Sequence, residues 1–250
     1  LIGRDGNMLL EKLVESGVDC SLLEHSEGVS GHAIIQVDDR GQNCILLHGG
    51  TNRMMTEEYV EHALDAFGGS GLVLLQNETN LVGSIIAHAK AKGLMTALNA
   101  APMDEAVFSY PLEQLDWLIV NEVEGAAIAR CTREEDILPA LERAYPHLNV
   151  LLTLGERGSV CVCGGEQTRF GAYRVKAADT TAAGDTFLGY FLNETINGAE
   201  VSDALALATA ASALCVQVMG AADSIPPREW TLSAVRSGEL GELLPWGGWR

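Results

Sequence analysis

The residues best suited to chemistry form one short run of small and acidic side chains, Asp179-Thr180-Thr181-Ala182-Ala183-Gly184-Asp185-Thr186. The run follows a strand-like segment at 172–175 and precedes an apolar segment typical of a helix. Small side chains let a ligand approach the backbone, and the first amides of a helix lack intrahelical partners. We therefore expect the amides of Ala182, Ala183 and Gly184 to bind a transferring phosphoryl group. Asp185, in the first turn, is placed to accept a proton from an attacking hydroxyl.

An ordinary structural explanation remains open for each of three motifs: the 179–186 run, Asn121 with Glu124, and the 153–158 run. A plain helix cap would explain one Gly-Asp pair, but not a wholly uncharged segment between two aspartates. Asn121 begins a helix and is equally well an ordinary cap, with Glu124 as the far half of a capping box. In the run Thr153-Leu154-Gly155-Glu156-Arg157-Gly158, two glycines three apart are more often a turn than a nucleotide-binding loop.

Alternating apolar segments must position these motifs. Short apolar runs at 71–75, 95–98, 115–120 and 150–154 predict buried strands, and helical patterns at 80–92, 122–129 and 134–144 separate them. This alternation indicates a mostly parallel sheet with helices on both faces. Late antiparallel strands are expected at 159–163 and 167–170, and closing helices at 184–195, 202–218 and 228–237. Ligands bind beyond the carboxyl ends of strands in such sheets, which is where the motifs lie.

The front of the chain has a different pattern. An amphipathic helix is predicted at 7–16 and another at 56–66, capped by Thr56. Two apolar runs at 32–37 and 43–47 flank Asp38-Asp39-Arg40-Gly41 and predict a hairpin. We expect a single α/β domain over 1–238 and a tail over 239–250.

Charge restricts the partners. The chain has 250 residues, with 16 basic against 34 acidic ones and a net charge of −18. Such a surface repels nucleic acid and anionic membranes, so we expect neither as a partner. None of the six cysteines forms a C-x-x-C pair, which favours small buried side chains in a reducing, cytoplasmic compartment. The sequence has neither the P-loop pattern of other kinases nor the G-x-G-x-x-G pattern of nicotinamide-dependent oxidoreductases.

Taken in order, the motifs resemble those of the ribokinase-like, or phosphofructokinase-B, carbohydrate kinases, and most of all their ribokinase members. The 179–187 run resembles the family signature D-T-x-A-A-G-D-x-F, and Asn121 to Glu124 resembles its N-x-x-E motif. The 153–158 run resembles its T-x-G-x-x-G loop. Leu98-Asn99-Ala100-Ala101-Pro102 and His48-Gly49-Gly50-Thr51-Asn52 resemble two further stretches. The likeness implies a three-layer α/β/α sandwich with a mostly parallel sheet and a small β lid at 32–47.

The resemblance also implies roles for individual residues. Asp185 would be the base, with Ala182, Ala183 and Gly184 as the anion hole, and Glu124 would hold Mg²⁺ through water. ATP would be bound by Asn121, Thr153, Gly155, Gly158, Gly184 and Thr209. A monovalent cation, K⁺, would be bound by Asp179, Thr181, Cys215, Val218, Gly220 and Ser224, mostly through backbone carbonyls. An ordinary helix-to-loop junction at Gly220 explains this segment equally well.

On the substrate side, the resemblance implies a sugar, with ribose the first expectation, and a homodimer formed through the lid. Glu78, after the strand at 71–75, matches a sugar-contacting position, although a carboxylate at a helix entry explains it equally well. Another sugar or a nucleoside is the sister interpretation.

The chain departs from the family pattern at its front. Leu1-Ile2-Gly3-Arg4-Asp5-Gly6 resembles the family's later I-G-x-D-x-x-G segment, and the preceding strand with its sugar-binding Asp and G-G-x-x-x-N segment has no counterpart. From this we expect the 250 residues alone to phosphorylate sugar inefficiently. A truncated, non-catalytic remnant that binds nucleotide or a partner is the alternative function.

Overall fold

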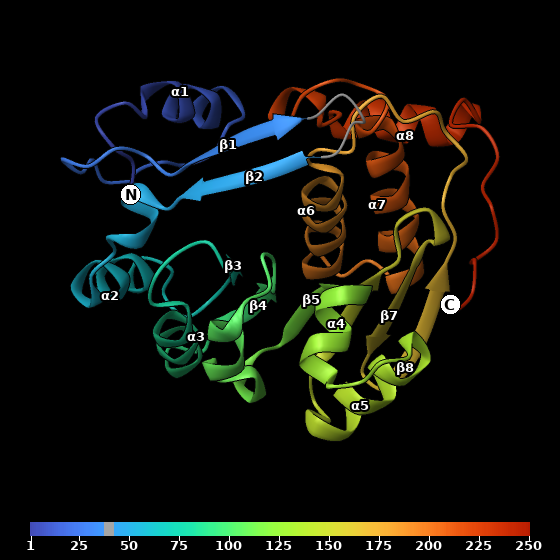
Figure 1. The fold of residues 1–250 in the computed structure, drawn as a ribbon, viewed down its shortest axis with the longest axis horizontal. Helices are drawn as coiled ribbons and strands as arrows, with labels where there is room; N and C mark the ends of the chain where they lie inside the picture. Colours follow the sequence, from blue (N-terminus) through green and yellow to red (C-terminus); the bar gives the residue numbers. More distant parts are fainter. Residues whose placement is uncertain (38–42) are drawn as a thin grey trace. The chain divides into compact units, whose positions relative to one another are not determined.

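The computed structural model describes residues 1–37 and 43–250, which form two compact units, Leu1–Gln114 and Leu115–Arg250 (Figure 1). The turn predicted at 38–41 lies outside the described residues. Within them, no helix is long and apolar enough to cross a membrane.

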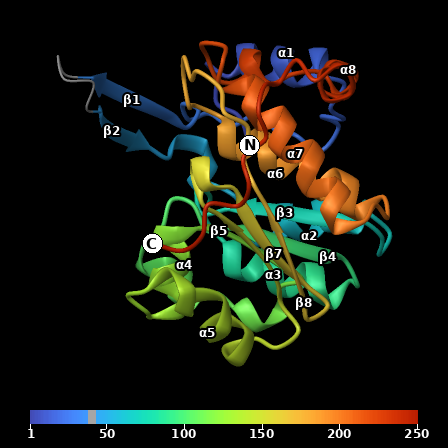
Figure 2. The same cartoon turned by 90° about the vertical axis from the view of Figure 1, so that its right-hand side faces the viewer.

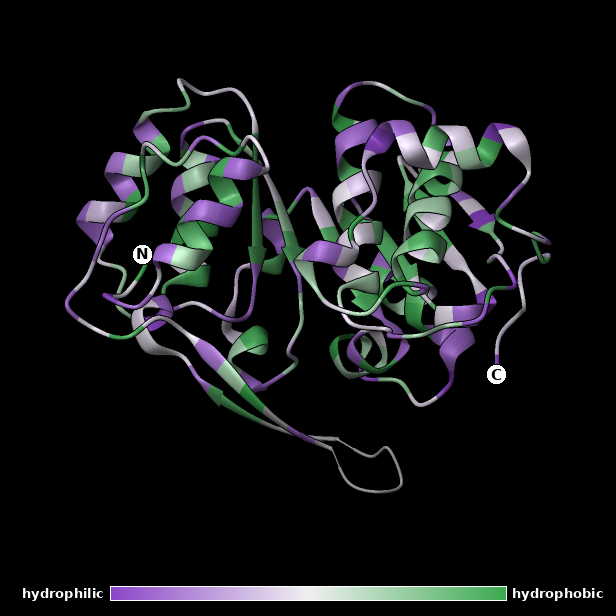
Figure 3. Ribbon diagram, turned by 90° about the horizontal axis from the view of Figure 1, so that it is seen from above, coloured by the Kyte–Doolittle hydropathy of each residue, from purple (hydrophilic) through white to green (hydrophobic). Residues whose placement is uncertain are grey.

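The first unit combines a separate hairpin with a parallel strand pair. The hairpin strands β1 and β2 pair from His32–His48 to Val37–Asn43, and in Figure 3 both carry hydrophobic residues. Ile34, Leu46 and Leu47 are exposed, so the hairpin is not buried in its own sheet. The elements of this unit are α1 (Asn7–Glu15), β1 (His32–Val37), β2 (Asn43–His48), α2 (Glu57–Asp65), β3 (Leu72–Gln76), α3 (Val82–Ala91) and β4 (Met95–Asn99), with 3₁₀ turns at Gly50–Arg53, Glu105–Ser109 and Leu112–Gln114.

Two predictions for this unit have different outcomes. The Thr56 cap is confirmed, because its hydroxyl accepts the Tyr59 N–H at 3.2 Å. The prediction that the strand at 71–75 is buried on both faces is wrong, since Leu74 is exposed and its neighbours are half-buried. β3 pairs in parallel with β4, and α2 and α3 pack together over a small core.

The second unit is a sheet covered on both faces. β5 (Trp117–Asn121) and β6 (Asn149–Thr153) are parallel, and β7 (Ser159–Cys163) and β8 (Glu166–Phe170) follow antiparallel. Figure 2 shows α4 and α5 on one face and α6 and α7 on the other. The elements are β5 (Trp117–Asn121), α4 (Glu122–Ala129), η4 (Glu134–Asp136), α5 (Ile137–Ala144), β6 (Asn149–Thr153), η5 (Gly155–Arg157), β7 (Ser159–Cys163), β8 (Glu166–Phe170), α6 (Ala183–Ile196), α7 (Val201–Cys215), η6 (Ala222–Ser224) and α8 (Arg228–Ser237).

An aromatic contact joins α6 to the sheet of this unit. Phe191 of α6 is fully buried and meets Trp117 of β5 edge-on, with ring centroids 5.3 Å apart.

The predicted strand at 172–175 is wrong, because only Tyr173 makes a bridge there, to Leu243. Residues 239–250 form no helix or strand and run beside this stretch, where Leu244 N–H donates to Ala172 O at 2.9 Å.

Candidate functional site

The start of α6 has an unusual backbone conformation. Asp179 Oδ1 accepts the Thr181 N–H at 2.9 Å, which turns the chain toward the helix. Ala182 then adopts a left-handed conformation with φ 61°, and α6 begins at Ala183. A left-handed alanine costs roughly 1–2 kcal/mol, so the surrounding structure must hold it. This geometry places the amides of Ala183 and Gly184 and the exposed Asp185 together in the first helical turn.

Hydrogen bonds refine the predicted anion hole. Ala183 N–H donates to Thr180 O at 3.3 Å, so it is not fully free, and Thr186 N–H closes the first turn on Ala182 O at 2.9 Å. The first turn of an α-helix leaves its amides without intrahelical acceptors, which makes this end a suitable anion site.

Side chains of α7 form hydrogen bonds with this turn. Ser212 Oγ donates to Ala183 O at 3.1 Å, and Thr186 Oγ1 donates to the buried Cys215 Sγ at 3.3 Å. The sequence did not identify Ser212, and a lone serine in an apolar helix offers no signal that would have done so. These contacts explain why the strained turn at Ala182 is tolerated.

The structure brings together five of the six residues proposed for the monovalent cation, Asp179, Thr181, Cys215, Gly220 and Ser224. Asp179 Oδ2 accepts the Gly220 N–H at 3.1 Å, and Cys215 Sγ contacts both Ser224 Oγ at 3.2 Å and Thr181 O at 3.8 Å. Val218 is exposed, and its N–H makes only the turn bond to Cys215 O at 3.1 Å. The two backbone N–H donors hold the pKa of Asp179 below its usual value, so it is anionic near neutral pH.

Asn121 and Glu124 form a capping box at the start of α4. Asn121 Oδ1 accepts the N–H groups of Val123 and Glu124, both at 2.9 Å, and Asn121 N–H donates to Glu124 Oε2 at 2.9 Å. Burial raises the pKa of Glu124, as does the charge of Glu122, while the bond from Asn121 lowers it. The cap interpretation is thus confirmed, and it leaves Glu124 Oε1 as the oxygen for another ligand.

The loop after β6 has the backbone that its glycines require. Thr153 faces Asn121 in the register of β5 and β6, so the two motifs lie at one sheet edge. Gly155 and Gly158 have φ of 58° and 97°, and a Cβ on Gly158 would lie 2.0 Å from Phe170 O. Thr209, in α7, has a buried hydroxyl with no hydrogen-bond partner among the described residues. An unpartnered buried hydroxyl is costly, which marks Thr209 for a role.

In the first unit, a buried amide controls the loop that carries Glu78. Asn77 is fully buried and its Nδ2 donates to Pro102 O at 2.8 Å and to Asp104 Oδ1 at 2.9 Å. Tyr110 Oη donates to Asn77 Oδ1 at 2.5 Å. Glu78 follows in an exposed turn, well before α3 begins. Asn77 was not identified from the sequence, where it stands only as the neighbour of Glu78.

Comparisons with known proteins agree with this geometry. A family model described as pfkB family carbohydrate kinase matches residues 2–228. The ribokinase of Staphylococcus aureus (strain COL) is 35% identical over 238 residues, which cover 90% of this chain and 77% of that protein. Thermotoga maritima ribokinase superposes with a TM-score of 0.80 at 29% identity, covering 94% of this chain and 79% of that one. Arabidopsis thaliana ribokinase complexed with ribose and ATP superposes with a TM-score of 0.77 at 28% identity, covering 94% and 80%.

These matches confirm the resemblance inferred from the motifs and the ribokinase-like α/β sandwich. They extend over both units and include the start of α6, the capping box and the glycine loop. The chain therefore belongs to the pfkB family of carbohydrate kinases.

Proposed function

We propose that this chain transfers the γ-phosphoryl group of ATP to a hydroxyl of ribose, with Asp185 as the general base. The observation that carries the proposal is the left-handed turn at Ala182, which opens α6 with Gly184 and Asp185 in its first turn. Backbone strain of this kind persists where the surroundings over-determine it, as at functional sites. The ribokinase names of the similar proteins, one solved with ribose and ATP, support the choice of substrates.

In this reaction the chain's own groups position and stabilise rather than form covalent bonds. Asp185 accepts the proton from the attacking hydroxyl, and the amides of Ala182, Ala183 and Gly184 stabilise charge on the transferring group. Phosphoryl transfer depends mainly on such positioning and electrostatics. Asn121, Thr153, Gly155, Gly158 and Thr209 are proposed to bind ATP, and the unpartnered Thr209 hydroxyl supports that assignment.

Glu124 is proposed to hold Mg²⁺ through water. In the described part of the chain, no three His, Cys, Asp or Glu side chains are grouped to cage a metal. Mg²⁺ in kinases is bound by one or two carboxylates together with phosphates and water, so a single fixed carboxylate fits. Glu124 is fixed by the capping box. When bound, the metal would supply positive charge against the phosphate oxygens.

K⁺ is proposed to bind beside the anion hole. The Asp179 carboxylate is anionic, and the carbonyl and hydroxyl oxygens of Thr181 and Ser224 lie in the same cluster. Oxygen donors and one negative charge suit a monovalent cation. We expect rates in potassium to exceed those in sodium or choline.

The first unit is proposed to supply the sugar contacts. Glu78 is exposed in a turn fixed by Asn77, and its carboxylate suits sugar hydroxyls. We further propose that β1 and β2 form a lid and pair with a second copy, because Ile34, Leu46 and Leu47 are exposed. A cytoplasmic location is proposed because the five described cysteines are free.

The direct test is Asp185→Asn, assayed for ATP-dependent ribose phosphorylation. Loss of a general base lowers kcat by about 10²–10⁴-fold, with the affinity for ATP nearly unchanged. Asp203→Asn is the matched control, because Asp203 is also a first-turn aspartate, at the start of α7. A fall of less than about tenfold in the Asp185 variant would remove the assignment of the base.

A further inference from the structure

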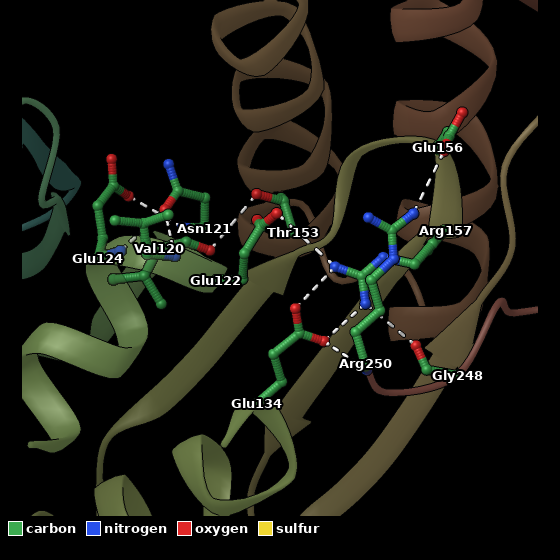
Figure 4. A network of polar contacts seen from close by, with 11 residues as sticks. Val120, Asn121, Glu122, Glu124, Glu134, Thr153, Glu156, Arg157, Gly248 and Arg250 are labelled. Carbon is green, nitrogen blue, oxygen red and sulfur yellow. Dashed lines mark hydrogen bonds and ion pairs between the residues drawn. The ribbon is translucent and has the colours of Figure 1, made fainter. Parts of the chain in front are cut away.

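Arg157 lies in the glycine loop after β6, but its side chain contacts residues outside that loop. The guanidinium donates to both oxygens of Glu134, at 2.6 Å from Nη1 and 3.0 Å from Nη2. The two side chains are 10% and 18% exposed, so solvent screens this pair far less than an ordinary surface pair. Figure 4 shows the pair between the loop and the turn that precedes α5.

The segment at 247–250 closes over the same arginine. Gly247 N–H donates to Arg157 O at 2.9 Å, and Arg157 Nη1 reaches Gly248 O at 3.3 Å. Arg250 N–H donates to Glu134 Oε2 at 2.8 Å. A Cβ on Gly247 would lie 2.9 Å from Arg157 Cβ, so the two backbones meet closely.

A third contact connects Arg157 to α4. Its Nη2 lies 3.7 Å from Glu122 Oε1, and Glu122 directly follows the capping residue Asn121. One guanidinium therefore contacts the first turn of α4, the turn at Glu134 and the 247–250 segment. The planar guanidinium has several N–H donors and can make these contacts together, whereas the single ammonium group of lysine cannot.

We propose that Arg157 is a positioning residue for ATP, and that Glu134 and the 247–250 segment are its anchors. We call these residues, with Glu122, the Arg157 cluster. This inference rests on the proposed function, because it assumes that Gly155, Gly158 and Asn121 contact ATP. By fixing the loop against α4, the cluster keeps the two elements proposed to bind ATP in a fixed arrangement. It acts on the nucleotide and not on the sugar.

The test compares Arg157→Lys and Glu134→Gln with wild type in the full chain. We expect the KM for ATP and the Kd for ADP to rise about tenfold, because small misplacements of a positioning group have large effects. The KM for ribose should stay within about twofold, because the Arg157 cluster holds only the elements proposed to bind ATP. A general loss of folded protein would not raise the KM for one substrate alone. Glu242→Gln is the matched control, because its pair with Arg174 also joins the last segment to the chain but is exposed.

The outcomes are distinct. Unchanged ATP and ADP constants in folded variants, or equal changes for ATP and ribose, would overturn the inference while leaving the proposed function intact. A wild-type chain that binds no nucleotide would overturn both.

If the variants do not fold, hydrogen exchange on wild type decides the matter. ADP should then slow exchange of the amides at 155–158 and at 247–250 together. Protection of 155–158 alone would show that the last segment plays no part and would overturn the inference.

Discussion

The loop after β3 and the loop after β6 are held in place by different chemistry. In the first, the neutral amide of Asn77 is fully buried and its side chain bonds to Pro102, Asp104 and Tyr110. In the second, the charged Arg157 cluster is partly solvated and draws on residues far apart in sequence. A buried neutral amide gives rigidity that depends less on pH and salt than that of an ion pair, which both can weaken.

The difference teaches where each loop is vulnerable. Truncating a fully buried side chain with every hydrogen bond made removes those bonds and leaves a cavity, and that cost is large. Replacing Glu134 by glutamine weakens the ion pair but keeps one hydrogen-bond acceptor for Arg157, so it should cost less stability, although it can still displace the loop that is proposed to bind ATP. Stability measurements should therefore respond mainly to the first region, and nucleotide affinity mainly to the second.

The largest expected effect on stability is that of Asn77→Ala. It removes three hydrogen bonds of a fully buried side chain and leaves Pro102 O and the Tyr110 hydroxyl without that partner, while Asp104 Oδ1 keeps the Ala106 N–H. We expect a loss of about 2–4 kcal/mol in the free energy of unfolding. Urea denaturation measures it. Asn197→Ala is the control, because Asn197 is exposed, and it should change stability by less than about 0.5 kcal/mol. Equal losses in both variants would contradict the contrast between buried and exposed amides.

Tyr110→Phe should have an intermediate effect. It removes only the hydroxyl that donates to Asn77 Oδ1, so we expect a loss of about 1 kcal/mol in urea denaturation. Combined with Asn77→Ala, the second change should add almost nothing, because the two side chains share one hydrogen bond. Full additivity would mean that the network does not act as a unit.

The smallest effect on stability is expected from Glu134→Gln, and it should depend on pH. The hydrogen bond from Arg157 lowers the pKa of Glu134 below its ordinary 4.5. A carboxyl whose folded pKa is depressed stabilises the protein above its unfolded pKa and loses that contribution as pH falls through the folded value. At neutral pH, the free energy of unfolding of wild type should exceed that of the variant by about 1 kcal/mol or less, because glutamine still accepts one hydrogen bond from Arg157.

Urea midpoints measured from neutral pH down to about pH 3 should bring wild type and variant together in acid. A difference that persisted undiminished there would show that Glu134 does not act through its charge.

Some of the site could be read directly from neighbouring residues. An Asn with a Glu three positions later predicts a capping box, and Asn121 and Glu124 form one. The small residues at 182–184 predict a helix start open to a ligand, and α6 begins at Ala183. These features depend on backbone geometry within a few residues, which the local sequence determines.

Other features depended on contacts between distant residues, so only the tertiary structure decided them. Apolar composition at 71–75 correctly predicted a strand, but its burial depends on which elements cover it, and Leu74 is exposed. Arg157 is a variable position of the T-x-G-x-x-G pattern, and its bond to Gly248 spans 91 residues. Asn77 likewise reaches Asp104 and Tyr110 only because the loops after β3 and β4 lie together. Local sequence determined where the helices and the turn at 179–185 begin, whereas the packing of strands and loops determined which side chains hold them.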